Sequence, residues 1–536
     1  MGLKQDLLGK GYLPENMPPA FTTKAAAAAI DAFSIGVYLS QARVRPAVYS
    51  ASKRGMTRRQ FSFVHPQTAH DNALFISSHW DKIEKFFDSS GFSESAPRWN
   101  EDSDRALEIS PHSHVEVTKA KKLSAYRFIA TTDISRFYHS IYTHSIPWAF
   151  HGKKSSKADN SESSKAVFFN RADFTTRRGQ DGQTIGIPVG PDTSRVLAEV
   201  VSTAIDVDFA SNCTVKDFEV VRHVDDVWIG TNTHADAERA LSEYRGAIRQ
   251  YELDINESKT KIFSSDFRFS DDWPTEIASK FDTAISSRSS NLVEERLRAA
   301  FEHAFALAVH RSDDAILKYA IRYIDRGVSR WAHWSTVEPF LKRAVVHYGH
   351  SIDYVARVLI WRQLVQGDVD TNSWSNILNS VLQRHAELGN DSEVCWATYA
   401  CLRLNIKIDE NIAKLIVQRC GPMSLLAILN SAESGIVPTS LFNSAKNVVT
   451  GENARGAMWP ILLEWKSRKW PNHGDVEIGD ELIGHLVEKE VTIFDPDQLT
   501  VVFSENSDSE YSSIGHAIEK RTSMYDEDEE DEFPDF

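Results

Sequence analysis

The chain has 536 residues, of which 42% are apolar and 25% are charged. It is too long for one hydrophobic core, and its composition is that of a globular protein with two or three domains. No apolar run reaches the roughly 18–20 residues that span a bilayer, and the N-terminus has no apolar signal sequence, so we expect no membrane partner. The four cysteines form no CxxC pair, which favours free thiols in a reducing cytoplasm.

Charge is distributed unevenly along the chain. The net charge of −15 argues against nucleic-acid binding, but the last twelve residues alone hold eight acids and no base. We predict a disordered acidic tail over residues 506–536, with a mimic of nucleic acid as the alternative. Residues 43–60 contain six Lys or Arg, no acid and the interleaved Tyr49, which suits phosphate contacts; a solvated basic loop is the alternative.

The first half of the chain mixes strands and helices. Residues 1–125 open with a proline-rich arm, continue with an alanine-rich helix-forming segment and include a strand-like alternation over residues 58–66. Residues 128–132 are predicted to form a strand that ends at Asp133 and is followed by helical spacing. The polar residues 152–181 are predicted to form a loop.

A second group of elements follows this loop. The Gly/Pro turn of residues 186–191 leads into a helix that one of the residues 192–194 is expected to cap. Residues 218–230 are predicted to form a hairpin, which is followed by an amphipathic helix and a short strand-like segment that carries Lys259. This order predicts a small antiparallel sheet backed by helices, as in ferredoxin-like folds.

The second half of the chain is predicted to be helical. Residues 283–291 have the composition of a linker, and residues 292–505 are expected to form an all-α domain. Helix pairs that recur at roughly 40 residues suit a HEAT-like α-solenoid. A helical bundle that only supports the first domain is the alternative.

The predicted hairpin carries two adjacent carboxylates. In the segment RHVDDVWIG, residues 222–230, Asp225 and Asp226 lie at the expected turn. Two adjacent anions resist joint burial unless a cation compensates them, and Mg²⁺ is a suitable partner for carboxylate oxygens. The alternative is that the Asp-Asp pair only forms the turn, because Asp is common in hairpin turns. Asp133 ends a strand 92 residues before Asp225, so neighbouring antiparallel strands would bring all three together. This arrangement is typical of a two-metal phosphoryl-transfer site.

The order of these motifs resembles the palm of reverse transcriptases, over about residues 10–265. TDISRFYHSI is similar to motif A, with Asp133 as its aspartate and Tyr138 at the position of the aromatic gate against a ribose 2′-hydroxyl. PVGPDTSRVLAEV resembles the motif B turn at Gly190 and Ser194. HVDD resembles motif C, and LDINESKTK resembles motif D.

This resemblance implies a fold and a chemistry. Residues 1–125 would be the N-terminal arm and fingers, and residues 126–282 the palm with fingers insertions within it. Two Mg²⁺ ions, or Mn²⁺, would bind to the three aspartates, and the substrates would be dNTPs. The implied nucleotide-binding residues are Lys53, Arg58, Arg59, Tyr138, Gly190, Ser194 and Lys259. Of these, Lys259 would protonate the pyrophosphate or shield its charge.

A narrower resemblance covers residues 137–153. The segment FYHSIYTHSIPWAFHGK is similar to one in abortive-infection (Abi) reverse transcriptases of bacterial phage defence. That likeness implies cytoplasmic synthesis of single-stranded DNA without a template, priming from a tyrosine that becomes covalently attached to the product, and a homo-oligomer. Tyr12, Tyr38 and Tyr49 are candidates for the priming residue because they lie in the N-terminal part.

Two positions depart from most reverse transcriptases. His223 stands where motif C usually has Tyr, and Val189 stands where motif B usually has Gln. Because the usual side chains contact the primer end and the template–nucleotide pair, their loss argues against ordinary templated copying. A templated defence-associated or retron-like reverse transcriptase is the first alternative, and an inactive polymerase fold that serves as a nucleic-acid-binding scaffold is the second.

Overall fold

The computed structural model describes residues 2–33, 36–39, 42–53, 57–266, 272–325, 332–449 and 454–499. The predicted acidic tail, residues 506–536, lies outside this part of the chain. None of the helices within the described part combines the length and apolar character that a bilayer crossing requires.

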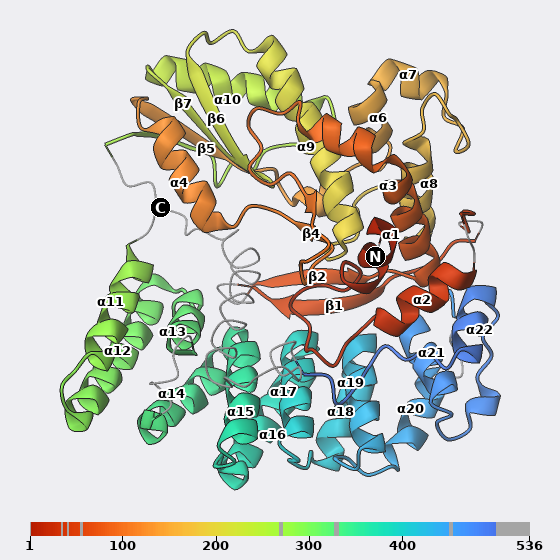
Figure 1. Ribbon diagram of the computed structural model, residues 1–536, viewed down its shortest axis with the longest axis vertical. Coiled ribbons are helices and arrows are strands. Elements are labelled where there is room, and N and C mark those ends of the chain that lie inside the picture. The colour runs from red at the N-terminus through yellow and green to blue at the C-terminus, as the bar shows by residue number, and fades with distance from the viewer. Residues whose placement is uncertain are drawn as a thin grey trace.

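The first part of the chain builds a helical layer and a two-stranded hairpin (Figure 1). Its elements are α1 (Leu3–Gly9), α2 (Lys24–Phe33), β1 (Ala47–Ser52), β2 (Arg58–Phe63), α3 (Pro66–Phe87), β3 (Arg98–Trp99), β4 (Leu107–Glu108) and α4 (His112–Leu123). β1 and β2 pair antiparallel, from Ala47 opposite Phe63 to Ser52 opposite Arg58. The strand predicted within residues 58–66 is therefore confirmed as β2.

A four-stranded antiparallel sheet forms the centre of the palm region. The elements are β5 (Phe128–Thr132), α5 (Phe137–Ser140), α6 (Ser145–His151), α7 (Lys153–Ala158), α8 (Asn170–Arg178), α9 (Asp192–Asn212), β6 (Phe218–His223), β7 (Asp226–Thr231), α10 (His234–Arg249) and β8 (Lys261–Ser264). The strand order is β6-β7-β5-β8, and every neighbouring pair is antiparallel. The predicted antiparallel sheet and its hairpin are confirmed, whereas the polar segment 152–181 contains two helices, α7 and α8, rather than a continuous loop.

Alternating side chains bind the sheet to helices on both faces. Ala130 and Ile229 belong to the main hydrophobic core, which includes residues of α9 and α10. Ile129 and Val221 pack on the other face with Val115 of α4. Because successive strand residues point to opposite faces, this two-sided apolar pattern requires a helical layer on each side of the sheet.

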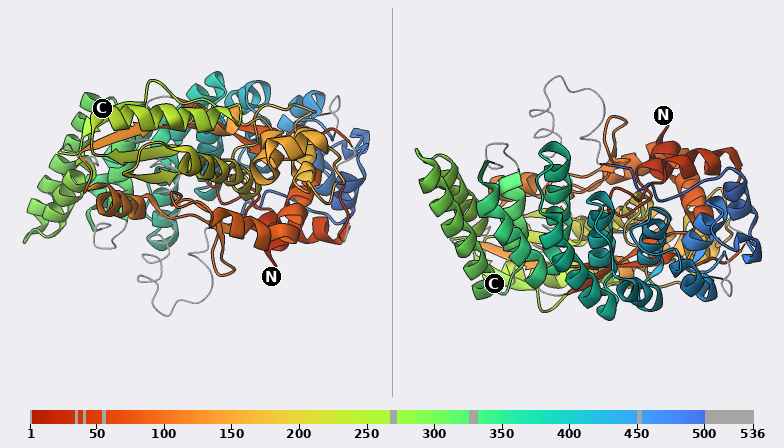
Figure 2. Two further views of the ribbon diagram at one scale, coloured as in Figure 1. Left: turned by 90° about the horizontal axis from the view of Figure 1, so that it is seen from above. Right: turned by 90° about the horizontal axis from the view of Figure 1, so that it is seen from below.

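Eleven of the twelve α-helices described after the palm form two rows. The twelve helices are α11 (Trp273–Ile285), α12 (Ser290–Arg311), α13 (Ala315–Asp325), α14 (Trp334–His347), α15 (Ile352–Val365), α16 (Thr371–Leu388), α17 (Asp391–Arg403), α18 (Glu410–Arg419), α19 (Pro422–Glu433), α20 (Leu441–Val449), α21 (Trp459–Ser467) and α22 (Glu481–Glu488), with the short 3-10 helices η3 (Gly349–Ser351) and η4 (His473–Asp475). Odd-numbered helices from α11 to α21 contact one another in succession, and so do even-numbered helices from α12 to α20. This stacking fits the predicted α-solenoid, whose HEAT-like repeats stay a prediction. Figures 1 and 2 show the rows passing along one side of the molecule.

The helical part contacts the first half of the chain at several places. The hairpin of β1 and β2 lies in the predicted fingers and is called the fingers hairpin below. Helices α17 and α19 pack against its strand β1, and α22 packs against α2 and α3. Near the end of the described chain, Thr22 N–H donates to Ile493 O at 3.0 Å and Asp495 N–H donates to Ala20 O at 2.7 Å. The helical part is therefore joined to both the fingers hairpin and the N-terminal arm.

Two sequence expectations about boundaries differ from the structure. The predicted linker, residues 283–291, is mostly helical, because α11 extends to Ile285 and α12 starts at Ser290. Helix α11 packs on α12 and α13 through buried residues such as Phe281, so it belongs to the helical rows. No side chain caps α9, since Pro191 occupies the N-cap position.

Candidate active site

Strand register brings the predicted aspartates together at one end of the two central strands, β5 and β7. β5 pairs with β7 so that Thr132 lies opposite Val227, and continuing this register by one residue places Asp133 opposite Asp226. Directly opposed residues project from the same face of an antiparallel pair. His223 pairs with Asp226 across the hairpin, so Asp225 is the second residue of a two-residue turn. The predicted hairpin is confirmed, but only Asp225 lies in its turn, because Asp226 is the first residue of β7.

Lys259 is the cation beside these carboxylates. Its Nζ lies 3.1 Å from Asp133 Oδ2. Burial lowers the pKa of Lys259, but Asp133, Asp226 and Asp225 outweigh that effect and raise its pKa above the ordinary value. Asn256 N–H donates to Asp133 O at 2.9 Å, which anchors the segment before Lys259 to the end of β5. The four predicted residues therefore form one electrostatic cluster.

The donor set fits divalent metal ions. Asp133 is 6% exposed, and its Oδ1 is buried without a hydrogen-bond partner among the described residues. A buried carboxylate oxygen in this state is costly unless a cation or proton compensates it, and three carboxylates are hard-oxygen ligands for such ions. Within the described part of the chain, no three His, Cys, Asp or Glu side chains already converge as a metal site. Lys259 supplies the positive charge at Asp133 in this arrangement.

A small cavity beside the hairpin brings together several other predicted residues. Its lining includes Arg59, Tyr138, Val189, Gly190 and Val224. The side chains thus come from the fingers hairpin, the segment after β5, the turn before α9 and the β6–β7 turn. This is the combination of elements that the sequence analysis predicted for a nucleotide site.

Gly190 is required at the cavity for two reasons. Its φ is +120°, a conformation that side-chain-bearing residues rarely adopt. A Cβ at this position would also lie 2.8 Å from Pro14 Cγ and 3.4 Å from Phe61 Cδ1. The N-terminal arm and β2 therefore close tightly over the motif B turn, and only glycine leaves room for them.

Arg58 does not belong to the cavity. Its Nη1 and Nη2 donate to Glu393 at 2.5 and 3.0 Å, and its Nε and Nη2 donate to Ser50 Oγ and O. Glu393 is 2% exposed at the start of α17, so Arg58 connects the fingers hairpin to the helical rows. The prediction that Arg58 holds triphosphate is not met by this geometry, because every guanidinium nitrogen already has an acceptor.

Two further predicted nucleotide-binding residues lie away from the cavity lining. Lys53 follows β1 at the tip of the fingers hairpin, where its N–H donates to Thr57 O at 2.9 Å. Ser194 is 2% exposed inside the first turn of α9. Their roles with nucleotide stay predictions.

His223 is packed in the interior. It is 1% exposed, and its Nε2 lies 3.2 Å from Ser110 O. The ring of His112 meets it edge to face at 6.1 Å between centroids. His223 is therefore a packed residue beside the hairpin in this structure.

The three candidate priming tyrosines differ in exposure. Tyr12 is 2% exposed and its hydroxyl donates to Val64 O at 2.7 Å, while Tyr49 is fully buried. Burial raises the pKa of both hydroxyls well above the ordinary value. Tyr38 is partly exposed and lies 4.6 Å below the Arg171 guanidinium. Of the three, Tyr38 is the one whose ring reaches the surface.

Sequence reasoning missed a buried ion-pair cluster at the base of the motif B turn. Arg105 donates to Asp192 Oδ1 at 2.8 Å and lies 2.9 Å from Glu15. It also donates to Gly190 O at 3.1 Å, so the cluster ties the N-terminal arm to the cavity turn. Asp192, one of the expected helix caps, is fully buried in this cluster instead. The partners are 85 or more residues apart, and no local pattern connects them.

Three carboxylates and a lysine lie together at one end of the two central strands of an antiparallel sheet, an arrangement that suits two-metal phosphoryl transfer. Residues 81–278 match the family model described as reverse transcriptase (RNA-dependent DNA polymerase). Residues 81–278 therefore correspond to a reverse transcriptase domain, which indicates nucleotidyltransferase chemistry for this part of the chain. Domains of this kind generally use divalent metal ions.

Similar solved structures include telomerases. The apo telomerase from Candida tropicalis truncated from its C-terminal domain aligns with 46% of this chain at 13% identity and a TM-score of 0.30, and the chain spans 56% of it. The apo telomerase from Candida tropicalis aligns with 76% of this chain and 69% of its own length, at 9% identity and a TM-score of 0.31. The Candida albicans telomerase in complex with a TWJ fragment of telomeric RNA has 10% identity and a TM-score of 0.27, over 74% of this chain and 64% of its own. A comparison with curated protein sequences gave no match.

Proposed function

We propose that this protein is an Abi-type DNA polymerase of bacterial phage defence, which polymerises dNTPs without a template and primes synthesis from one of its own tyrosines. The observation that carries the polymerase part is the cluster of Asp133, Asp225, Asp226 and Lys259. The Abi-specific part rests on the YTHSIPW segment, together with His223 and Val189 at positions that contact primer and template in most reverse transcriptases.

Each residue has a role in the proposed reaction. Asp133, Asp225 and Asp226 would hold two Mg²⁺ ions, which would lower the pKa of the attacking hydroxyl and neutralise the pyrophosphate. Lys259 would move from Asp133 toward the leaving pyrophosphate, whose negative charge would keep it protonated as a donor or a counter-charge. The side chain of Tyr138 lines the cavity and would exclude a ribose 2′-hydroxyl.

The remaining parts of the chain would handle the product. The helical rows, proposed to be HEAT-like, would guide single-stranded DNA and form contacts between subunits of a homo-oligomer in the bacterial cytoplasm. A solenoid exposes long surfaces that suit both tasks. Of the candidate priming residues, Tyr38 is favoured because the hydroxyls of Tyr12 and Tyr49 are buried.

The test is incubation of the purified full-length protein with labelled dNTPs and Mg²⁺, without nucleic acid. We expect label that stays attached to the protein on a denaturing gel and is released by nuclease. Asp225→Ala combined with Asp226→Ala is expected to abolish incorporation and to leave the unfolding temperature unchanged or higher, since it removes two repelling carboxylates. Full incorporation by the double variant would overturn the site assignment.

A templated RNA-directed polymerase is the second candidate, and the match of residues 81–278 to the reverse transcriptase family favours it. Strict dependence of incorporation on an added primer–template would establish this candidate and reject protein priming. If a folded protein incorporates dNTPs under neither condition, both candidates fail and the scaffold alternative stands.

A further inference from the structure

The turn that carries Asp225 contains a strained residue. Val224 has φ +52° and is the first of the two residues that connect β6 to β7. Two-residue hairpin turns normally use Gly, Asn or Asp where φ is positive, and a β-branched residue there is a genuine outlier. Because Val224 does not favour this conformation by itself, its surroundings must impose it.

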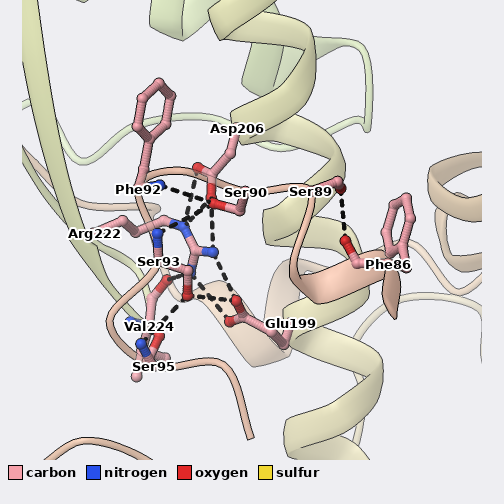
Figure 3. A network of polar contacts seen from close by, with 10 residues as sticks. All are labelled: Phe86, Ser89, Ser90, Phe92, Ser93, Ser95, Glu199, Asp206, Arg222 and Val224. Carbon is pink, nitrogen blue, oxygen red and sulfur yellow. Dashed lines mark hydrogen bonds and ion pairs between the residues drawn. The ribbon is translucent and has the colours of Figure 1, made fainter. Parts of the chain in front are cut away.

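Two hydrogen bonds impose the conformation of Val224. Val224 N–H donates to Ser95 Oγ at 2.7 Å, and Arg222 Nη1 donates to Val224 O at 3.0 Å. Figure 3 shows Val224 together with Ser95 and Arg222. The two bonds hold the peptide groups before and after Val224, so they fix the direction in which the chain enters Asp225.

Arg222 is itself held rigidly by α9. It is fully buried; its Nε donates to Asp206 Oδ2 at 2.8 Å, and its Nη2 donates to Glu199 Oε1 at 2.8 Å (Figure 3). Burial lowers the pKa of Arg222, but Asp206 and Glu199 outweigh that effect and raise it. A planar guanidinium that is bound by two carboxylates has one allowed orientation.

The loop after α3 completes the network. Ser90 Oγ donates to Asp206 Oδ2 and Ser93 Oγ donates to Glu199 Oε1, both at 2.6 Å. Arg222 N–H donates to Phe92 O at 2.8 Å, so the loop runs beside β6 and brings Ser95 to the turn. Helix α9, this loop and the β6–β7 hairpin are thereby connected through buried polar contacts.

We propose that Arg222 and Ser95 are positioning residues for the metal-binding carboxylates, because they hold Val224 in the left-handed conformation that aims Asp225 and Asp226 at the metals. The proposal rests on the proposed polymerase function. It also connects the two halves of the site: α9 starts at the turn that lines the nucleotide cavity, and the same helix carries Glu199 and Asp206. A purely structural network would stabilise the palm without affecting metal binding.

The key variant is Ser95→Ala, which removes one hydrogen bond to the turn and leaves the buried ion pairs intact. Ser431→Ala is the control. Ser431 is buried as Ser95 is, and its hydroxyl makes one hydrogen bond to the backbone, which it donates to Ala427 O in α19. Val224→Gly supplies a residue that adopts positive φ without support. Combining it with Ser95→Ala gives a double-mutant cycle.

The measurement is titration of each full-length protein with Mn²⁺ alone, followed by electron paramagnetic resonance, with kcat and KM for dNTP measured alongside. We expect Ser95→Ala to weaken Mn²⁺ binding about tenfold and to lower kcat at fixed metal concentration, with the KM for dNTP unchanged. The control Ser431→Ala should bind Mn²⁺ as the unsubstituted protein does. In the Val224→Gly background, Ser95→Ala should change Mn²⁺ affinity less than about twofold.

Two results would overturn the proposal: unchanged Mn²⁺ affinity in Ser95→Ala, or an equal loss of affinity from Ser95→Ala in the presence and in the absence of Val224→Gly. Failure of the underlying function has a different signature. If the Asp225→Ala, Asp226→Ala protein binds Mn²⁺ as the unsubstituted protein does, the metal site itself is misassigned, whatever Ser95→Ala does.

Discussion

Substitution of Arg58 by Met separates the role that its sequence position implied from the role that its contacts indicate. Substitution of a residue that binds triphosphate would raise the KM for dNTP and leave the stability of the protein nearly unchanged. In the structure, Arg58 makes a two-pronged ion pair with Glu393 and also bonds Ser50. We therefore expect Arg58→Met to destabilise the contact between the fingers hairpin and α17.

The magnitude follows from the burial of the two partners. Removing one partner of a fully buried pair costs about 3–5 kcal/mol, because the other charge stays buried without compensation. The Glu393 side chain is 2% exposed, but that of Arg58 is 26% exposed, so water partly screens the pair. Allowing for this screening, we expect Arg58→Met to lower the free energy of unfolding by about 2–3 kcal/mol.

Urea unfolding and steady-state kinetics on the same preparations provide the assay. Glu393→Gln should lose a comparable free energy, and Arg58→Met with Glu393→Gln should lose less than the sum of the two, because the double variant leaves no buried charge. Arg59→Met is the matched control at the adjacent position. Arg59 lines the cavity, so its loss should raise the KM for dNTP several-fold and leave the unfolding midpoint nearly unchanged.

The opposite pattern would refute this reasoning. If Arg58→Met raises the KM for dNTP while the urea midpoint stays that of the unsubstituted protein, Arg58 contacts nucleotide and the pair with Glu393 contributes little. Additive losses in the double variant would likewise show that Arg58 and Glu393 stabilise the protein independently.

Three further predictions concern single residues. Lys259→Met should lower kcat about 10²-fold, the usual effect of losing a proton donor, as measured by single-turnover incorporation; an unchanged kcat would exclude that role. Burial, together with two neighbouring basic side chains, lowers the pKa of His112 from the ordinary 6.5 to about 3. Between pH 6.5 and pH 3, the imidazole of His112 is therefore protonated in the unfolded chain and neutral in the folded one. Stability is therefore full above pH 6.5 and falls by about 1.4 kcal/mol per unit as the pH drops toward 3, and urea unfolding of His112→Gln should lack this component of the slope. Gly190→Ala should destabilise the protein by about 1–3 kcal/mol because of its positive φ and the proximity of Pro14, whereas Gly246→Ala, in open space on α10, should stabilise it by about 1 kcal/mol in the same assay.

Local pattern and motif order were sufficient to predict the antiparallel sheet and the cluster of aspartates. The run around Asp225 alternates as two strands, and Asp133 ends a third strand, so antiparallel pairing had to place them near one another. The observed register, Thr132 opposite Val227, agrees with that expectation. The resemblance to reverse transcriptase motifs, and not the strand pattern, predicted that Lys259 and the turn at Gly190 belong to this site.

Contacts between segments that are far apart in the sequence could not be predicted from local pattern. Arg58 and Glu393 are 335 residues apart, and nothing near either residue indicates the other. A basic run in a sequence is compatible with phosphate, solvent or a buried acid, and only the packing of α17 on β1 selected the acid for Arg58. The supposed linker at residues 283–291 shows the same limit, since the burial of Phe281 against α12 and α13 depends on helices that polar local composition does not report.

The sequence by itself predicted a small antiparallel sheet that brings three aspartates together, because strand periodicity is a local property. The tertiary structure alone decided which charged residues face the cavity and which are bound inside the protein. Arg222 is one residue from His223 and three from Asp225, yet its role depends on Glu199 and Asp206 of another helix. Burial removes such groups from water, so each must find its partner wherever the folded chain places one.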